Sequence, residues 1–299
     1  MTKPRYATPQ AFKQALEQRL RTTSTSGIDI ERRRQLLVFE RFLARVSAVE
    51  GDAVVLKGGL VLELRLARAR TTKDVDLRMM GTPAELLARL QAAGRADLHD
   101  FLRFEVQRDR HHPDIRTEGM KYAGHRFTAE CRLAGKPYGR PFGVDVAFGD
   151  PLVGTPDEVR CDDLLDFAGI EPATLRLYPV VSHIAEKLHA YSLPRTRPNS
   201  RVKDLPDLAL LASVGALDAK TLRTALERTF TFRATHALPD RLPQPPVNWE
   251  APYRAMAERD ELQWPDLDAV ADAARAFLDP ILDRTMRSGS WQSTSWRWV

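Results

Sequence analysis

Residues 53–60 read Ala-Val-Val-Leu-Lys-Gly-Gly-Leu, and residues 72–77 read Thr-Lys-Asp-Val-Asp-Leu. The apolar residues before the lysine predict a short buried strand, which Gly58 and Gly59 end by letting the backbone turn tightly. Residues 60–68 then have the spacing of a helix. The two glycines therefore lie where a strand leads into a helix, and the free N–H groups at the start of a helix favour phosphate binding.

The second stretch alternates polar and apolar residues, which predicts a strand with Asp74 and Asp76 on the same face. Asp145, which stands alone among apolar neighbours on a later predicted strand, is costly to bury unless it faces the same site. Carboxylates that close repel one another, and a divalent cation between them removes the repulsion. Each motif alone is usually an ordinary turn or a solvated strand face, but their order and spacing favour a phosphoryl- or nucleotidyl-transfer site.

The composition is that of a globular protein, with 299 residues of which 43% are hydrophobic and 28% charged. No apolar run approaches the roughly 20 residues that cross a bilayer, and the N-terminus shows no apolar secretory segment. Cys131 and Cys161 are too few for a disulfide framework or a zinc site. We therefore expect a cytoplasmic protein without a membrane partner.

The charge leaves two interpretations open. The formal net charge is +5, and arginine supplies most of the positive charge. Arginine forms bidentate contacts with phosphate, so this balance suits a nucleic-acid partner. A GC-rich genome also produces a chain rich in alanine, arginine and leucine.

The rest of the chain predicts an α/β part followed by a mainly helical part, with the change of character near residues 150–175. A tryptophan-rich C-terminal segment is interpreted either as a flexible tail or as indoles packed on the body or on a partner. The spacing predicts helices over 10–20, 28–49, 84–93 (ended by Gly94), 180–191, 204–214, 218–230 and 266–286, and strands over 101–107, 125–133 and 142–148.

Two polar residues of the helical part, Lys187 and Asp207, have two interpretations each. Lys187 lies beside the apolar stripe of its predicted helix, so it points toward the neighbouring domain or extends along the surface. Asp204 and Asp207 lie at the start of the next helix, where capping is the ordinary explanation. The functional interpretation is that Asp207 closes the site opposite the carboxylate pair. The basic segment 195–201 would then receive nucleotide or RNA phosphates.

These motifs in this order resemble the AbiEii-type nucleotidyltransferase toxins, which include the MenT toxins of mycobacteria and belong to the DNA polymerase β-like nucleotidyltransferase superfamily. The resemblance implies an α+β fold, with a nucleotidyltransferase-like mixed sheet and flanking helices over residues 1–160. A mainly helical domain over residues 161–299 would complete the active-site cleft. The resemblance covers about residues 50–210 and rests on K-G-G at 57–59, T-K-D-V-D at 72–76, Asp145, E-K-L-H-A at 186–190 and K-D-L-P-D-L at 203–208.

The resemblance also implies roles for individual residues. Thr72 aligns with a hydroxyl residue that can be phosphorylated in a mycobacterial relative to silence the toxin. Leu60 stands where the family often has Ser or Thr, which removes a hydroxyl from the phosphate cradle but leaves the backbone N–H groups. The implied metal ligands are Asp74, Asp76 and Asp145; the implied catalytic residues are these three with Lys187 and Asp207; the implied nucleotide-binding residues are Lys57, Gly58, Gly59, Thr72 and Lys73.

The implied function is a Mg²⁺-dependent nucleotidyltransferase toxin of a toxin–antitoxin system. It would transfer NMP from an NTP to the 3′ end of tRNA and so block translation, held off by a separate antitoxin protein. Two alternatives stay open: the same site would modify a protein or a small molecule, or the chain is a non-catalytic RNA-binding or antitoxin-like module. The three clustered acids argue against the second. The chain has no G-x-x-x-x-G-K-[ST] motif, which argues against a P-loop kinase.

Overall fold

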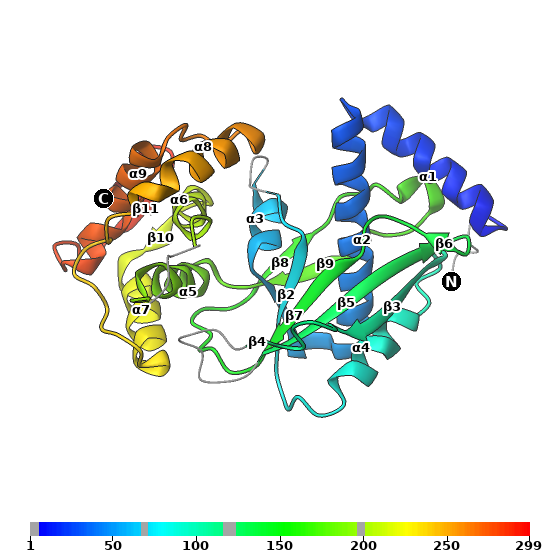
Figure 1. Ribbon diagram of the computed structural model, residues 1–299, viewed down its shortest axis with the longest axis horizontal. Coiled ribbons are helices and arrows are strands. Elements are labelled where there is room, and N and C mark those ends of the chain that lie inside the picture. Colours follow the sequence, from blue (N-terminus) through cyan, green and yellow to red (C-terminus); the bar gives the residue numbers. More distant parts are fainter. Residues whose placement is uncertain (1–5, 67–70, 116–123, 196–200) are drawn as a thin grey trace.

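The computed structural model describes residues 6–66, 71–115, 124–195 and 201–299. Figure 1 shows a sheet with α1, α2 and α4 on one side of the molecule and the helices α5 to α9 on the other. The elements are α1 (Pro9–Thr23), α2 (Gly27–Glu50), β1 (Val54–Lys57), α3 (Gly59–Arg65), β2 (Asp74–Met79), α4 (Leu86–Arg95), β3 (Leu102–Arg108), β4 (Asp114–Ile115), β5 (Gly124–Leu133), β6 (Lys136–Pro137), β7 (Phe142–Ala147), β8 (Asp157–Arg160), β9 (Thr174–Leu177), α5 (Val180–Ser192), α6 (Asp204–Ser213), β10 (Leu217–Asp218), α7 (Ala219–Arg233), α8 (Glu250–Arg259), α9 (Leu267–Leu282), β11 (Ser290–Gln292) and β12 (Arg297–Trp298).

The large sheet is mixed, and its strands lie in the order β3-β5-β7-β2-β1-β9-β8, with β4 and β6 paired to β5. The pairs β2–β7 and β1–β9 are parallel, whereas β1–β2 and β5–β7 are antiparallel. In this register Asp76 lies opposite Lys57 on one side and Asp145 on the other. The predicted α+β class with a mixed sheet and flanking helices is confirmed.

The two faces of the sheet have different environments. On β2 every second residue is buried, namely Val75, Leu77 and Met79, and these pack in one apolar core with side chains of α1, α2 and α4. Because side chains alternate along a strand, Asp74 and Asp76 point to the opposite face. One face of β2 thus packs in the apolar core, and the opposite face carries polar side chains.

The helical part has a second apolar core, built from α5 to α9 and the C-terminal segment. Strands β10, β11 and β12 form a small separate sheet. Trp291 on β11 is fully buried, and its indole Nε1 donates a hydrogen bond to the carbonyl of Ala212 at 2.8 Å. The tryptophan-rich C-terminal segment therefore packs on the helical part.

Several elements differ from the sequence-based expectation. Strands β8 and β9 were not expected, and β9 continues the large sheet beyond residue 160; helix α8 was not expected either. Helix α4 continues through Gly94, where a Cβ atom would lie 2.5 Å from the carbonyl oxygen of Phe104, so this glycine permits close packing against β3 and does not end the helix. Helix α3 ends at Arg65.

Some expectations fall outside the described residues: the last residues of the helix expected over 60–68, and all of the basic segment 195–201 except its two ends. In the described part of the chain, no helix combines the length and the apolar character that crossing a membrane requires.

Candidate active site

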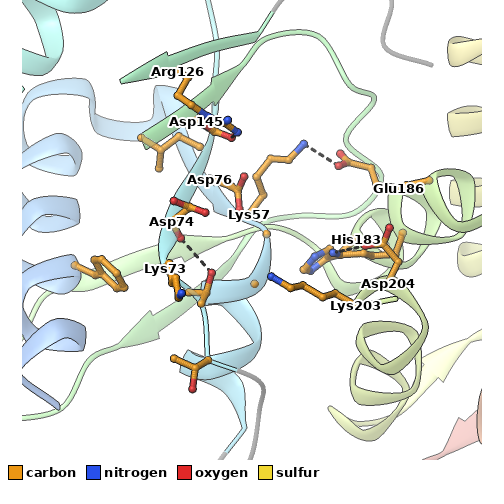
Figure 2. A pocket seen from close by; sticks show the side chains of 18 of the residues that line it. Lys57, Lys73, Asp74, Asp76, Arg126, Asp145, His183, Glu186, Lys203 and Asp204 are labelled. Carbon is orange, nitrogen blue, oxygen red and sulfur yellow. Dashed lines mark hydrogen bonds and ion pairs between the residues drawn. The ribbon is translucent and has the colours of Figure 1, made fainter. Parts of the chain in front are cut away.

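A cleft of about 1180 Å³ lies between the polar face of the sheet and the helical part. Side chains from both parts line it, and Figure 2 shows them converging from the strands and from the helices. Asp207 is the predicted site residue that does not line the cleft. Those that line it are Lys57, Gly58, Gly59, Thr72, Lys73, Asp74, Asp76, Asp145 and Lys187.

The acidic side of the cleft is formed by β2 and β7. Asp74 is exposed at the start of β2, and Asp76, two residues further along, lies half-buried beside Asp145 in the parallel register. The pKa of Asp76 is raised to about 6, because burial first, then the carboxylate of Asp145 and finally that of Asp74 outweigh the opposing effect of Lys57 and Lys187. The site therefore concentrates negative charge that a cation would offset.

The glycine turn is shaped to fit against these acids. Gly58 has φ +72° and ψ −160°, a conformation that side chains other than hydrogen rarely adopt, and a Cβ atom there would overlap the Asp76 carboxylate. Gly143 on β7 leaves room for the Asp74 carboxylate in the same way, because a Cβ atom at Gly143 would lie 2.5 Å from Asp74 Oδ1. Gly143 was not identified from the sequence, since its role depends on the pairing of β2 with β7.

Arg126 is a second residue that the sequence did not reveal. It lies opposite Asp145 in the β5–β7 register, and its Nε and Nη2 atoms donate hydrogen bonds to the two carboxylate oxygens at 2.7 and 2.6 Å. This bidentate bond to Asp145 raises the pKa of Arg126 above its already high value. The predicted third metal ligand thus has a guanidinium partner, as Figure 2 shows.

Lys57 connects the sheet to the helical part. Its Nζ lies 2.7 Å from Glu186 on α5 and 3.4 Å from Asp150, which in turn accepts hydrogen bonds from Arg233 on α7. Burial alone would lower the pKa of Lys57, but Glu186 and Asp150 outweigh it and raise the pKa. The lysine predicted to bind the triphosphate is therefore held by carboxylates of this network, and the dashed line in Figure 2 marks its bond to Glu186.

Lys187 points inward from α5, as one of its two interpretations required. Its Nζ lies 2.7 Å from Asp207 Oδ2 and 2.9 Å from Asp204 Oδ1, and Asp207 is fully buried. Helix α6 begins at Asp204 itself and has no side-chain capping bond, so the expected cap is absent, although both acids do lie in the first turn, where the helix dipole favours them. The two acids fix the ammonium group at the helical wall of the cleft.

The remaining predicted residues lie around the glycine turn. The backbone N–H of Thr72 donates to the Glu63 carboxylate, and the Thr72 hydroxyl is 3.4 Å from the carbonyl of Asp74. Lys73 is exposed on the cleft wall. Leu60 is 1% exposed and packs in the apolar core, so the position after the glycine pair has no polar side chain near the cleft.

The residues present fit a cation at Asp74 and Asp76 better than a three-acid centre. Within the described ranges, no three His, Cys, Asp or Glu side chains are grouped so that they could hold a metal ion. Asp145 is engaged by Arg126, whereas the Asp74–Asp76 pair has the repulsion that a divalent cation would relieve.

Comparison with known proteins gives one family and several solved structures. Residues 41–279 match the sequence model of a family described as "Nucleotidyl transferase AbiEii toxin, Type IV TA system". No curated protein matches significantly. The chain is similar to MenT4, a nucleotidyltransferase toxin from Mycobacterium tuberculosis H37Rv, at 17% identity and TM-score 0.49, covering 95% of this chain and 100% of that one. It is also similar to JHP933 from Helicobacter pylori, at 14% identity and TM-score 0.45, covering 84% and 93%.

Proposed function

This chain belongs to the AbiEii family of nucleotidyltransferase toxins of type IV toxin–antitoxin systems, and we propose that it transfers NMP from an NTP to the 3′ end of tRNA. The reaction requires Mg²⁺ and blocks translation in the cytoplasm. Membership of the family implies an antitoxin partner. The observation that supports the proposal most is that the Asp74–Asp76 pair faces the same cleft as Lys187, which Asp207 holds in place.

Each wall of the cleft has a separate task in this proposal. Asp74 and Asp76 hold Mg²⁺, which supplies positive charge to the triphosphate when bound. The glycine turn brings backbone N–H groups to the phosphates at the start of α3. Lys187 directs its ammonium group at the phosphate tail, and because Asp204 and Asp207 already fix its position, little reorganisation is needed when charge develops.

The bond changes follow from this placement. The 3′ oxygen of the acceptor attacks the α-phosphorus in line, the bond from that phosphorus to the bridging oxygen breaks, and pyrophosphate leaves. The proton of the acceptor hydroxyl passes to a carboxylate, for which the exposed Asp74 is the accessible choice. Lys187 offsets the charge that accumulates on the pyrophosphate.

The size and charge of the cleft favour an RNA acceptor over a small molecule. Its volume of about 1180 Å³ exceeds the 300–1,000 Å³ that is usual for small-molecule sites. Basic side chains outnumber acidic ones in its lining, which suits a polyanion. Those that belong to neither the predicted catalytic nor the predicted nucleotide-binding residues include Arg140, Arg195, Arg201 and Lys203.

The test is to incubate the purified protein with each labelled NTP and Mg²⁺, together with tRNA, with total RNA or with cell lysate. We expect label on the 3′ end of tRNA, and its loss in Asp74→Ala, whose exposed side chain makes no contribution to the core. Asp240→Ala, an exposed acid outside the cleft, is the matched control and should transfer normally.

Three results would contradict the proposal in different ways. Full activity of Asp74→Ala removes the assignment of the site. Label on a protein or a small molecule in place of RNA would mean that the acceptor is different, while the assignment of nucleotidyl transfer would stand. No transfer with any NTP, in a protein that binds RNA, supports a non-catalytic module.

A further inference from the structure

His183 is a buried polar side chain in the first turn of α5 that the mechanism above does not use. It lines the cleft yet is only 2% exposed. Both ring nitrogens are buried, and neither has a hydrogen-bond partner among the described residues. Buried polar groups in folded proteins are nearly always hydrogen-bonded. Two unpartnered nitrogens on one cleft-lining ring therefore indicate that the ring hydrogen-bonds to a ligand of the cleft.

The charges around the ring indicate what kind of ligand it is. Burial, and then the nearby ammonium of Lys187, lower the pKa of His183 well below its usual value; Lys57 and Arg65 act in the same direction, and Asp207 opposes them. The imidazole is therefore neutral at physiological pH, with one N–H donor and one acceptor nitrogen. Burial is the main cause of this neutrality, and three of the four charged neighbours that act on the ring are cations, which favours an anionic ligand.

We propose that His183 binds the phosphate tail of the nucleoside triphosphate, donating its ring N–H to a phosphate oxygen. Figure 2 shows the ring projecting from the helical side toward the strand that carries Lys57, with Lys203 pointing toward the same part of the cleft. The inference rests on the proposed function and extends it, because it adds a neutral donor on α5, one helical turn before Lys187.

A neutral donor suits this position for two reasons. A further positive charge would lie within the field of Lys187 and Lys57 and would be repelled, whereas a neutral N–H adds a hydrogen bond at no such cost. In addition, Leu60 follows the glycine pair with a buried apolar side chain, so that position supplies no hydroxyl to the phosphates. His183 provides a side-chain donor from the opposite wall.

The structure also separates binding from stability at this residue. A histidine that is needed for the fold loses stability when it is replaced, because its partners in the protein are left unsatisfied. Here the ring nitrogens have no such partners in the described part of the chain, so His183→Leu removes two unsatisfied polar atoms and keeps a similar apolar bulk. We expect an unchanged or higher thermal midpoint together with weaker binding of phosphate.

The experiment is calorimetric titration of the full chain with Mg²⁺ and inorganic tripolyphosphate, then with an NTP and with the corresponding nucleoside. His183→Leu should bind tripolyphosphate and the NTP about tenfold more weakly, the effect of one lost hydrogen bond to a charged group. Nucleoside binding should not change. His183→Asn keeps an N–H donor and should recover part of the affinity, and the exposed His112→Leu serves as the matched control.

The outcomes separate this inference from the function on which it rests. Wild-type affinity for tripolyphosphate in a folded His183→Leu overturns it and leaves the orphaned nitrogens to a water molecule. A lower thermal midpoint in both His183 variants, with equal affinity for all ligands, also overturns it in favour of a structural role. If the wild-type protein binds neither tripolyphosphate nor any NTP, the proposed function itself fails.

Discussion

Replacing Asp76 with asparagine should stabilise the protein at neutral and alkaline pH while abolishing nucleotidyl transfer. The pKa of this carboxyl is about 6 in the folded protein, against 3.8 for an ordinary aspartate, because burial and then Asp145 disfavour its charge. The folded state therefore binds this proton more tightly than the unfolded state does. The stability that the proton contributes is complete below the unfolded pKa and is lost as the pH rises through about 6.

The size of the effect follows from the shift. About two pKa units at 1.36 kcal/mol each give close to 3 kcal/mol as an upper value. Asp76→Asn mimics the neutral carboxyl, so the stability difference between variant and wild type should be smallest at pH 4, intermediate at pH 5 and largest at pH 8. Taking the difference cancels the titration of the other groups.

The assay is urea denaturation at these pH values in the presence of EDTA, with Asp240→Asn as an exposed control that should show no pH-dependent difference. Adding Mg²⁺ should stabilise the wild type alone and narrow the gap, because the cation interacts with the charged carboxylate. A difference that is equal at pH 5 and pH 8 would refute the reasoning, and so would a variant less stable than wild type at pH 8. Either result would mean that Lys57 and Lys187 already offset the charge in full.

Two further substitutions test the geometry around this acid. Gly58→Ala should destabilise the fold by at least about 2 kcal/mol in urea denaturation and abolish transfer, because it combines a strained backbone with overlap on Asp76. Gly169 has φ +70° but open space around it, so Gly169→Ala should cost only about 1 kcal/mol. Equal costs for the two variants would contradict the overlap. Arg126→Gln should raise the affinity for Mn²⁺ about tenfold in calorimetric titration, because Asp145 loses its guanidinium partner and becomes able to bind the cation. An unchanged affinity would mean that Asp145 does not belong to the cation site.

The local part of the site was predictable because each signal lies within a few residues of sequence. Alternation fixes that Asp74 and Asp76 share a face, and the glycine pair marks the exit from a buried strand into a helix. Lys187 was placed beside an apolar stripe by helical spacing alone, and the structure confirms that it points inward. None of these inferences needs to know which strand lies next to which.

The missed residues depend on that longer-range information. Arg126 faces Asp145 only because β5 pairs with β7 in one particular register, and a shift by one residue would turn it to the other face. Gly143 similarly has its role through the β2–β7 pairing. Strands β8 and β9 are four residues each, too short for periodicity to distinguish them from a turn-rich connection.

The docking of the two parts also could not be derived from sequence, and it changes the interpretation of Lys57. A lysine before a glycine pair suggests a phosphate contact, but its nearest acid, Glu186, lies on a helix of the other part. Asp204 and Asp207 show the same difficulty, since acids in a first turn usually act as caps and here bind Lys187 across two helices. The local sequence pattern indicates which residues are unusual, but their partners are determined by how the two parts of the chain pack together.

The pairing of three cleft cations with acids explains how the cleft accepts a triphosphate without first rearranging these side chains. Lys187 is fixed by Asp207, Lys57 by Glu186 and Arg126 by Asp145, so each of these three positive groups is held at a defined point by a carboxylate. Long, flexible side chains would otherwise lose conformational entropy on binding a ligand, and here folding has already ordered them. An incoming triphosphate with its cation adds both signs of charge together, which leaves these pairs close to electrostatic balance. On this basis the carboxylates that hold the lysines are as important to the site as the lysines themselves.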